Sequence, residues 1–395
     1  MICRVMLFAS LTIALSACDW DSSGTIELII NDDTDTGGVC PQLPPESTDQ
    51  KVCHVWECSE VDGPDCWECS FVPGDEGVDC ELSVDGIGVC LQGVCSPVPD
   101  PAELGDLGGT VASHELHFET GIFDTDIPLT IYVPDGDGPF PVVVFTHGYQ
   151  LGAADYDSYG KHLATWGYLV VMPDMPDGFG GANHVELAEF TVAILDWIDE
   201  IAASGTWQGK VDPSKLALAG HSMGGKISML VSTKDKRPQA VFGIDPVDDG
   251  VPMGSAADYP SVTPELMGNI TIPLGILGET TNATCSGTWC KACAPADDNF
   301  QQYYEHAASP ALQIEIVGAN HMSFLDNPNC GFVCSMCDDG TDDTDTTRML
   351  TQRYLTAFLN VFVNDNSAYR KFLDGSEMDA DVAAGLTLYE SKNGF

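Results

Sequence analysis

The sequence predicts an α/β domain whose mostly parallel sheet is covered by helices on both faces, preceded by a small disulfide-rich module. Two observations predict the sheet. Short, nearly continuous runs of Val, Ile and Leu recur after residue 105, and amphipathic stretches separate them. A third observation predicts the module, because eight cysteines fall between residues 40 and 95, where aliphatic residues are few.

The apolar runs give the expected strands, and helical spacing of apolar residues gives the expected helices. Within 185–203, for example, Leu187, Phe190, Ile194 and Trp197 recur at the spacing of one helix face. The expected strands are 129–133, 141–145, 169–172, 216–219, 241–244, 274–277 and 312–317. The expected helices are 185–203, one that begins at Lys226, and 347–363.

The N-terminus predicts export and a lipid anchor. Arg4 precedes an apolar run over 5–14, which is too short to span a bilayer. The run ends in the tetrapeptide LSAC, which resembles the lipobox of bacterial lipoproteins and implies cleavage before Cys18 and acylation of that residue. We expect an exported protein, lipid-anchored to a bacterial membrane at the cell surface, the outer membrane or the periplasmic side. A plain secretory signal is the alternative.

Composition shifts divide the chain into five predicted segments. They are a lipoprotein signal peptide over 1–17, an acidic tether over 18–39, a cysteine-rich module over 40–95, a Pro-rich linker over 96–104 and a large α/β domain over 105–395.

The charge balance excludes one class of function. The chain has 60 acidic and 15 basic residues, for a formal net charge of −45. A nucleic-acid-binding protein needs a basic surface to neutralise phosphates, so this class is excluded. Electrostatic adhesion to anionic lipid headgroups is disfavoured for the same reason. We interpret the acidic residues as a solvated surface rather than a binding tail.

Export favours disulfides for the remaining cysteines, which form two even groups once Cys3 and Cys18 are set aside. The first group is Cys40, Cys53, Cys58, Cys66, Cys69, Cys80, Cys90 and Cys95; the second is Cys285, Cys290, Cys293, Cys330, Cys334 and Cys337. We expect bridges between the two halves of the second group, which would hold the segments on either side of residue 321. Zinc at Cys290, Cys293, Cys334 and Cys337 is the alternative, because these residues form two C-x-x-C pairs.

A nucleophile motif follows one of the predicted strands. The run 216–219 leads into Gly220-His221-Ser222-Met223-Gly224, and a helix is expected soon after. G-x-S-x-G between a strand and a helix places the serine oxygen on a sharp turn above the sheet. The pattern predicts Ser222 as a nucleophile and the backbone amide of Met223 as one oxyanion donor.

A serine nucleophile needs a base and an acid that orients the base. His321 ends the tetrapeptide GANH (318–321), which directly follows the run 312–317, and it precedes the last long helix, which suits the base. Two acids fit the chain order: Asp245 after the strand 241–244, and Glu279 after the strand 274–277. His147 and His221 lie inside the motifs around the oxyanion and nucleophile turns, where we expect them to brace these turns.

The second oxyanion donor is expected in the loop after the strand 141–145. This loop reads Thr146-His147-Gly148-Tyr149-Gln150, and we assign the backbone amide of Tyr149. Its ring would wall the acyl pocket.

These motifs resemble the dienelactone-hydrolase-like branch of the α/β-hydrolases. The resemblance rests on HGY at 147–149, LAxxGYxVVxPD at 163–174, GHSMGGK at 220–226 and IDPVD at 244–248. Within that branch the chain is most similar to chlorophyllase-like and platelet-activating-factor-acetylhydrolase-like esterases and to cutinase-like polyester hydrolases. The resemblance implies an α/β-hydrolase fold over about 129–363. It also implies that the acid follows the strand after the nucleophile, which selects Asp245.

The predicted function is that of a serine carboxylic-ester hydrolase acting on a neutral apolar ester, such as a lipid, a short-chain ester or a polyester. The alternative is a surface lipoprotein that binds a partner through the cysteine-rich module, with the hydrolase domain as scaffold. No cofactor is expected. The acidic tract 338–345 lacks EF-hand spacing, so we interpret it as a solvated loop rather than a calcium site.

Overall fold

The chain divides into two compact units, with the boundary between Pro97 and Val98. The computed structural model describes five strands between residues 54 and 96, and then residues 98–119, 124–176, 183–249, 255, 257–285, 292–331 and 334–395. The signal, the tether and Cys40, Cys53 and Cys66 lie outside the described residues. Within the described part, no helix is both long and apolar enough to cross a membrane.

The first unit contains two small antiparallel sheets. One is a two-stranded pair, β1 (His54–Glu60) and β2 (Trp67–Pro73), in which Cys58 lies opposite Cys69. The other is formed by β3 (Asp79–Leu82), β4 (Gly86–Leu91) and β5 (Val94–Ser96), in which Cys90 lies opposite Cys95.

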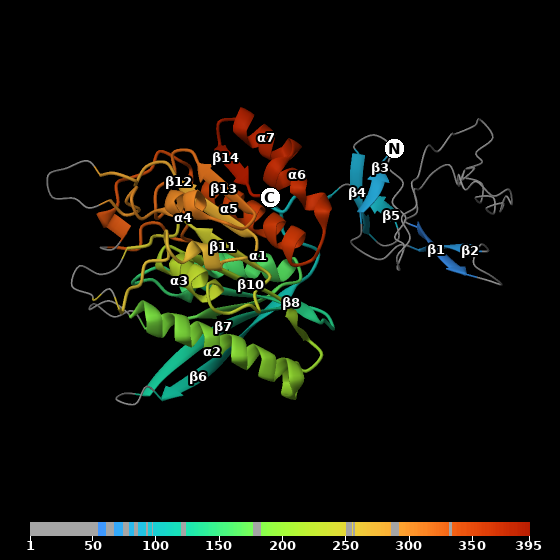
Figure 1. The fold of residues 1–395 in the computed structure, drawn as a ribbon, viewed down its shortest axis with the longest axis horizontal. Helices are drawn as coiled ribbons and strands as arrows, with labels where there is room; N and C mark the ends of the chain where they lie inside the picture. Colours follow the sequence, from blue (N-terminus) through green and yellow to red (C-terminus); the bar gives the residue numbers. More distant parts are fainter. Residues whose placement is uncertain are drawn as a thin grey trace. The chain divides into compact units, whose positions relative to one another are not determined.

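The second unit is built on one nine-stranded sheet (Figure 1). Its strands, in chain order, are β6 (Gly109–Glu119), β7 (Asp124–Pro134), β8 (Phe140–Thr146), β9 (Leu169–Pro173), β10 (Val211–His221), β11 (Ala240–Ile244), β12 (Leu274–Glu279), β13 (Ala311–Ile316) and β14 (Thr387–Lys392). Across the sheet the order is β14-β13-β12-β11-β10-β8-β9-β7-β6. The six strands from β13 to β9 are parallel, and the outer strands β14, β7 and β6 pair antiparallel.

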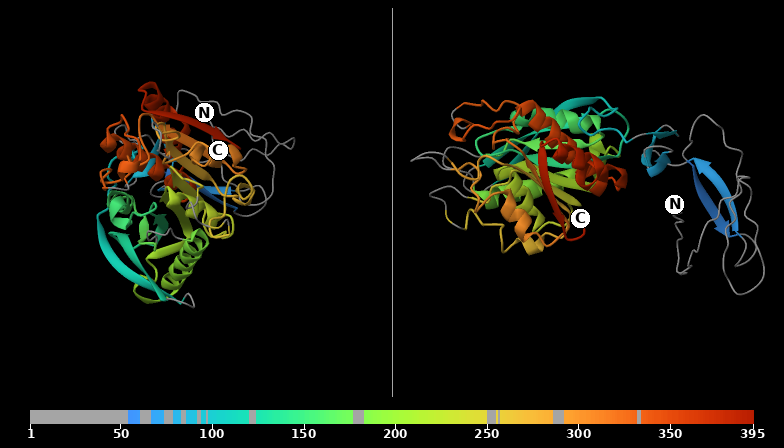
Figure 2. Two further views of the ribbon diagram at one scale, coloured as in Figure 1. Left: turned by 90° about the vertical axis from the view of Figure 1, so that its left-hand side faces the viewer. Right: turned by 90° about the horizontal axis from the view of Figure 1, so that it is seen from above.

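Helices lie on both sides of this twisted sheet (Figures 1 and 2). They are α1 (Asp157–Thr165), α2 (His184–Ala203), α3 (Met223–Ser232), α4 (Phe300–His306), α5 (Thr344–Phe362), α6 (Lys371–Asp374) and α7 (Ser376–Ala383). Helices α2 and α3 contact each other and β10, whereas α1 contacts α5 away from that pair. The arrangement confirms the predicted α/β-hydrolase fold.

The central strands are apolar because both of their faces are buried. Every residue of β9 and β11 is buried, and Val142, Val143 and Val144 of β8 are fully inaccessible. Strands that are buried on both faces have continuous hydrophobic sequences, so they can be recognised from the sequence, and all seven expected strands are present. The edge strands β6 and β14 were not expected, because their exposed residues interrupt any apolar run.

The helix after the nucleophile motif begins earlier than expected. Helix α3 begins at Met223 rather than at Lys226, although glycine is a poor helix former. Gly224 is required there, because a Cβ at this position would lie 2.0 Å from the Thr146 carbonyl oxygen.

The second unit begins at Val98, inside the expected Pro-rich linker 96–104. Val98 is buried, and the Pro101 carbonyl accepts a hydrogen bond from His162 Nε2 at 2.9 Å. Asp100 binds the Arg353 guanidinium, with Arg353 Nε 2.8 Å from Asp100 Oδ1. These contacts fix residues 98–101 of the expected linker to the domain.

Candidate active site

Ser222 sits on a sharp turn between β10 and α3. Its backbone has φ 54° and ψ −120°, a conformation that is costly for a residue other than glycine. The Ser222 amide donates to the Ile244 carbonyl at 2.9 Å, which fixes the turn to the end of β11. A Cβ on Gly220 would lie 2.6 Å from the backbone of Gly224, so the motif's glycines allow the strand and the helix to approach this closely.

His321 lies in the loop after β13 and contacts Ser222 and Asp245. Its Nε2 is 2.9 Å from Ser222 Oγ, and its Nδ1 is 2.5 Å from Asp245 Oδ2. A carboxylate oxygen accepts, so Nδ1 carries the proton and Nε2 is free to accept from the serine hydroxyl. The His321 side chain is 5% exposed, so solvent hardly competes for these bonds.

Asp245 directly follows β11 and has φ 41°, and its amide donates to the Leu277 carbonyl at 2.5 Å. The side chain is completely buried, and burial raises the pKa of its carboxyl above the ordinary value while His321 opposes this shift. Among the described residues, Asp245 Oδ1 has no hydrogen-bond partner. The bond to His321 is therefore the main compensation for the charge that Asp245 carries when ionised.

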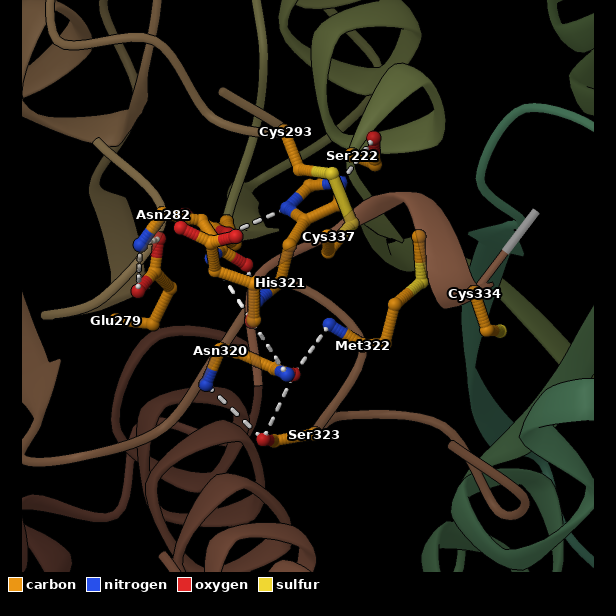
Figure 3. The surroundings of a disulfide bond; sticks show 12 residues. Ser222, Glu279, Asn282, Cys293, Asn320, His321, Met322, Ser323, Cys334 and Cys337 are labelled. Atoms are coloured by element: carbon orange, nitrogen blue, oxygen red, sulfur yellow. Dashed lines mark hydrogen bonds and ion pairs between the residues drawn. A yellow bond between two sulfur atoms is a disulfide. The ribbon is translucent and has the colours of Figure 1, made fainter. Parts of the chain in front are cut away.

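Glu279, the alternative acid, contacts the backbone rather than the imidazole. Its carboxyl accepts hydrogen bonds from the amides of Thr281 and Asn282. Asn282 in turn accepts from the His321 amide at 2.9 Å (Figure 3). Burial and the charge of Asp245 raise the pKa of Glu279 to about 8. The imidazole of His321 thus bonds to Asp245, whereas Glu279 reaches only the backbone of the His321 loop, through Asn282.

The loop assigned to the oxyanion is fixed by His147. Its Nδ1 donates to the Gly148 carbonyl at 2.8 Å, and its Nε2 accepts from the Met175 amide at 2.8 Å. Tyr149 follows in this loop and is partly buried. Met223 is the first residue of α3, and the first four amides of a helix have no partner within it.

A buried ion pair that the sequence did not reveal supports the loop after Asp245. Lys226 Nζ is 3.1 Å from Asp248 Oδ1, and both side chains are fully buried. The Asp248 carboxylate also accepts from the amides of Val262 and Thr263 at 2.7–3.0 Å. Removing one partner of such a pair typically costs about 3–5 kcal/mol. The pair fixes α3 to the segment that follows β11.

Disulfides surround the loop that carries His321. Cys293 and Cys337 are bonded across 44 residues, which joins the loop after β12 to the loop after β13 (Figure 3). Cys330 and Cys334 form a second bond, and Cys285 is also disulfide-bonded. Cys290 lies outside the described residues. The Cys293–Cys337 bond joins the two halves of the cysteine group, as expected. The Cys330–Cys334 bond departs from the expectation, because both residues belong to the same half and lie only four residues apart. Three of the four candidate zinc ligands are engaged in disulfides.

The acidic tract 338–345 binds its own neighbours. Asp342 accepts from the hydroxyls of Ser323 at 3.1 Å and Thr347 at 2.5 Å, and Asp345 pairs with Arg348. Within the part of the chain that the structure describes, no three His, Cys, Asp or Glu side chains are grouped to hold a metal ion. The tract leads into α5 and contacts the His321 loop through Ser323.

The sheet, together with a serine on the turn after a central parallel strand, defines the second unit as an α/β-hydrolase. Comparison with known proteins narrows this class. Residues 107–382 match the chlorophyllase family, so the chain belongs to that family.

The chain is 25% identical over 270 residues to chlorophyllase-2 of Arabidopsis thaliana, covering 64% of this chain and 83% of the relative. It is 26% identical over 310 residues to chlorophyllase type 0 of Chenopodium album, covering 72% and 84%. Cutinase 1 of Thermobifida cellulosilytica is 22% identical over 246 residues, covering 62% and 76%. The family and these relatives indicate a carboxylic ester hydrolase, and confirm the resemblance stated for the sequence.

The Cys293–Cys337 bond gives a stability prediction. The bond closes a loop of 44 residues, and on the loop-entropy scale the entropy it removes from the unfolded chain stabilises the folded state by about 4 kcal/mol. We expect the double variant Cys293→Ala/Cys337→Ala to lower Tm by roughly 5–10 °C in thermal unfolding without reductant.

The matched control is Cys330→Ala/Cys334→Ala, which opens a bond between residues only four apart. The same scale gives about 2 kcal/mol for it, so its Tm should fall about half as far. Peptide mapping of the unreduced protein that finds Cys293 and Cys337 as free thiols would contradict the pairing.

Proposed function

We propose that the chain hydrolyses carboxylic esters with Ser222 as nucleophile, His321 as general base and acid, and Asp245 as the residue that orients His321. One observation carries the proposal. Hydrogen bonds of 2.9 Å and 2.5 Å form a continuous chain from Ser222 through His321 to Asp245. The three residues follow β10, β13 and β11, whose carboxyl ends lie at one edge of a parallel sheet.

The reaction proceeds in two halves. His321 Nε2 takes the proton of Ser222 as its oxygen attacks the ester carbonyl, and the tetrahedral intermediate collapses when His321 returns the proton to the leaving alcohol. The acyl group then remains on Ser222. Water, deprotonated by His321, then attacks the acyl carbonyl. The bond between this carbonyl and Ser222 Oγ breaks, His321 returns the proton to Ser222, and the carboxylic acid leaves. Asp245 stabilises the imidazolium that forms in each half because its carboxylate faces Nδ1.

The amides of Met223 and Tyr149 would bind the oxyanion. Met223 lies at the positive end of the α3 dipole, where an anion is stabilised. Such donors act only when negative charge develops, so they lower the barrier without tightening the ground state, and each is worth about a hundred- to thousandfold in rate.

The proposed substrate is a neutral apolar ester, either a lipid, a short-chain ester or a polyester. The net charge of −45 repels anionic molecules from the surface, which favours uncharged substrates. Relatives named as chlorophyllases and as a cutinase support an ester with an apolar part.

Active-site labelling tests the nucleophile. A fluorophosphonate should label the folded wild type, and Ser222→Ala should lose both the label and at least about a thousandfold in turnover of nitrophenyl esters. The matched control is Ser228→Ala on the same helix, whose buried hydroxyl donates to the Ala219 carbonyl. Folded wild-type protein that resists labelling would refute the proposal.

Two amide substitutions test the acid. Asp245→Asn should reduce kcat by roughly ten-thousandfold, because an amide cannot stabilise the imidazolium or enforce its tautomer. Glu279→Gln should keep kcat within about tenfold, since its contacts are to backbone amides that a glutamine oxygen also accepts. The opposite ranking would transfer the role to Glu279.

We also propose that Cys18 carries the lipid that holds the enzyme at a bacterial membrane. Expressed in a lipoprotein-processing bacterium, the full chain should incorporate a palmitate analogue and sediment with membranes. Cys18→Ser should lose both while it retains esterase activity, and Cys3→Ser, within the cleaved segment, should keep both. Unlabelled wild-type protein would favour the plain secretory signal.

The alternative function, partner binding through the cysteine-rich module with the second unit as scaffold, does not require the Ser222–His321–Asp245 chain. Active esterase would leave such binding only as an additional role.

A further inference from the structure

Besides the hydrogen bonds that join Ser222, His321 and Asp245, the site contains a second, buried chain of hydrogen bonds that has no role in the mechanism above. The Gly148 amide donates to the Tyr156 hydroxyl at 3.2 Å, and this hydroxyl lies 2.6 Å from His221 Nδ1. His221 Nε2 lies 3.0 Å from the carbonyl oxygen of His321. The chain therefore joins the oxyanion loop to the backbone of the histidine loop, through the residue that precedes Ser222.

Only one arrangement of protons satisfies this chain. A carbonyl oxygen can only accept, so His221 Nε2 carries a hydrogen and donates to His321. In a neutral imidazole Nδ1 is then an acceptor, so the Tyr156 hydroxyl donates to it and accepts from Gly148. Burial and the neighbouring His321 hold the pKa of His221 well below its ordinary range, and burial keeps the pKa of Tyr156 well above its own.

The surroundings allow little movement along the chain. Tyr156 and His221 are both completely inaccessible to solvent. The Tyr156 ring packs 5.2 Å from the Phe145 ring, and the His221 ring packs 5.7 Å from the Phe324 ring. A Cβ on Gly148 would lie 3.1 Å from His221 Nδ1 and 3.2 Å from the Tyr156 hydroxyl, so the oxyanion loop rests directly on the chain. Hydrogen bonds shielded from water in this way hold their geometry firmly.

We propose that Tyr156 and His221 are positioning residues for catalysis: they set the spacing between the oxyanion loop and the catalytic imidazole. Gly148 directly precedes Tyr149, whose amide is the assigned oxyanion donor, and His221 directly precedes the nucleophile. A shift at either end of this hydrogen-bond chain would move the Tyr149 amide relative to the His321 imidazole. Such misplacement lowers kcat more than it weakens substrate binding. This inference rests on the proposed esterase function.

The test is Tyr156→Phe, which removes only the hydroxyl. We expect kcat for a nitrophenyl ester to fall about ten- to hundredfold, with KM within about twofold, because the transition state loses its alignment while the acyl pocket stays. The matched control is Tyr168→Phe. Tyr168 is equally buried, and its hydroxyl bonds to Asn360 and Asn364 rather than to an active-site loop. Its kcat should equal that of wild type.

A pair of substitutions at His221 separates positioning from packing. Glutamine can donate to the His321 carbonyl and accept from Tyr156, so His221→Gln should keep kcat within about fivefold. Leucine fills similar space but does neither, so His221→Leu should lose about as much as Tyr156→Phe. The double variant Tyr156→Phe/His221→Leu should lose no more than the worse single variant, since both interrupt the same chain.

The outcomes distinguish this inference from the proposed function. Wild-type protein that neither binds fluorophosphonate nor hydrolyses esters refutes the function itself. If the wild type is active and Tyr156→Phe and His221→Leu keep the wild-type kcat, with or without a raised KM, only the positioning role is overturned. If Tyr156→Phe does not fold, the kcat values of His221→Gln and His221→Leu are compared instead. Each value is corrected for the concentration of active sites, measured by fluorophosphonate titration. Equal kcat for these two variants overturns the inference.

Discussion

The buried hydrogen bond between Asp245 and His321 is the interaction on which the rest of the site depends. A carboxylate with no exposed surface is tolerated only if it is compensated, and its second oxygen has no partner among the described residues. The imidazole must therefore stay within hydrogen-bond distance of Asp245, which requires the loops after β11 and β13 to be fixed relative to each other. The Lys226–Asp248 pair fixes the first of these loops, and the Cys293–Cys337 bond fixes the second.

The parts of the site that the sequence predicted are those encoded by short segments. Ser222 was identifiable because a strand, a glycine-rich turn and a helix follow one another within a few residues. His321 was identifiable because it lies in the short loop that follows a buried strand. The central strands were predicted for the same local reason, whereas β6 and β14 were missed because an edge strand needs no continuous apolar run.

Long-range contacts could not be predicted in this way. Tyr156 and His221 are 65 residues apart, and nothing in either neighbourhood marks their hydroxyl–imidazole bond. The Lys226–Asp248 pair is similar, since a buried lysine reads in sequence as one more surface charge. The even number of cysteines predicted disulfides, but which partners lie within bonding distance depends on how the loops after β12 and β13 meet. The choice between Asp245 and Glu279 came from family resemblance.

Asp245 and Glu279 are two buried carboxyl groups near His321, and only Asp245 bonds to the imidazole ring. Like charges placed close together in a buried site cannot both ionise cheaply, so the charge of Asp245 adds to burial in raising the pKa of Glu279. Asp245 gains the imidazole as a counter-charge, whereas Glu279 is left with the amides of Thr281 and Asn282, and its pKa rises to about 8. Below that pH Glu279 is neutral and adds no charge behind the base. Through Asn282 it still holds the His321 backbone, so this carboxyl contributes structure to the loop and Asp245 contributes charge.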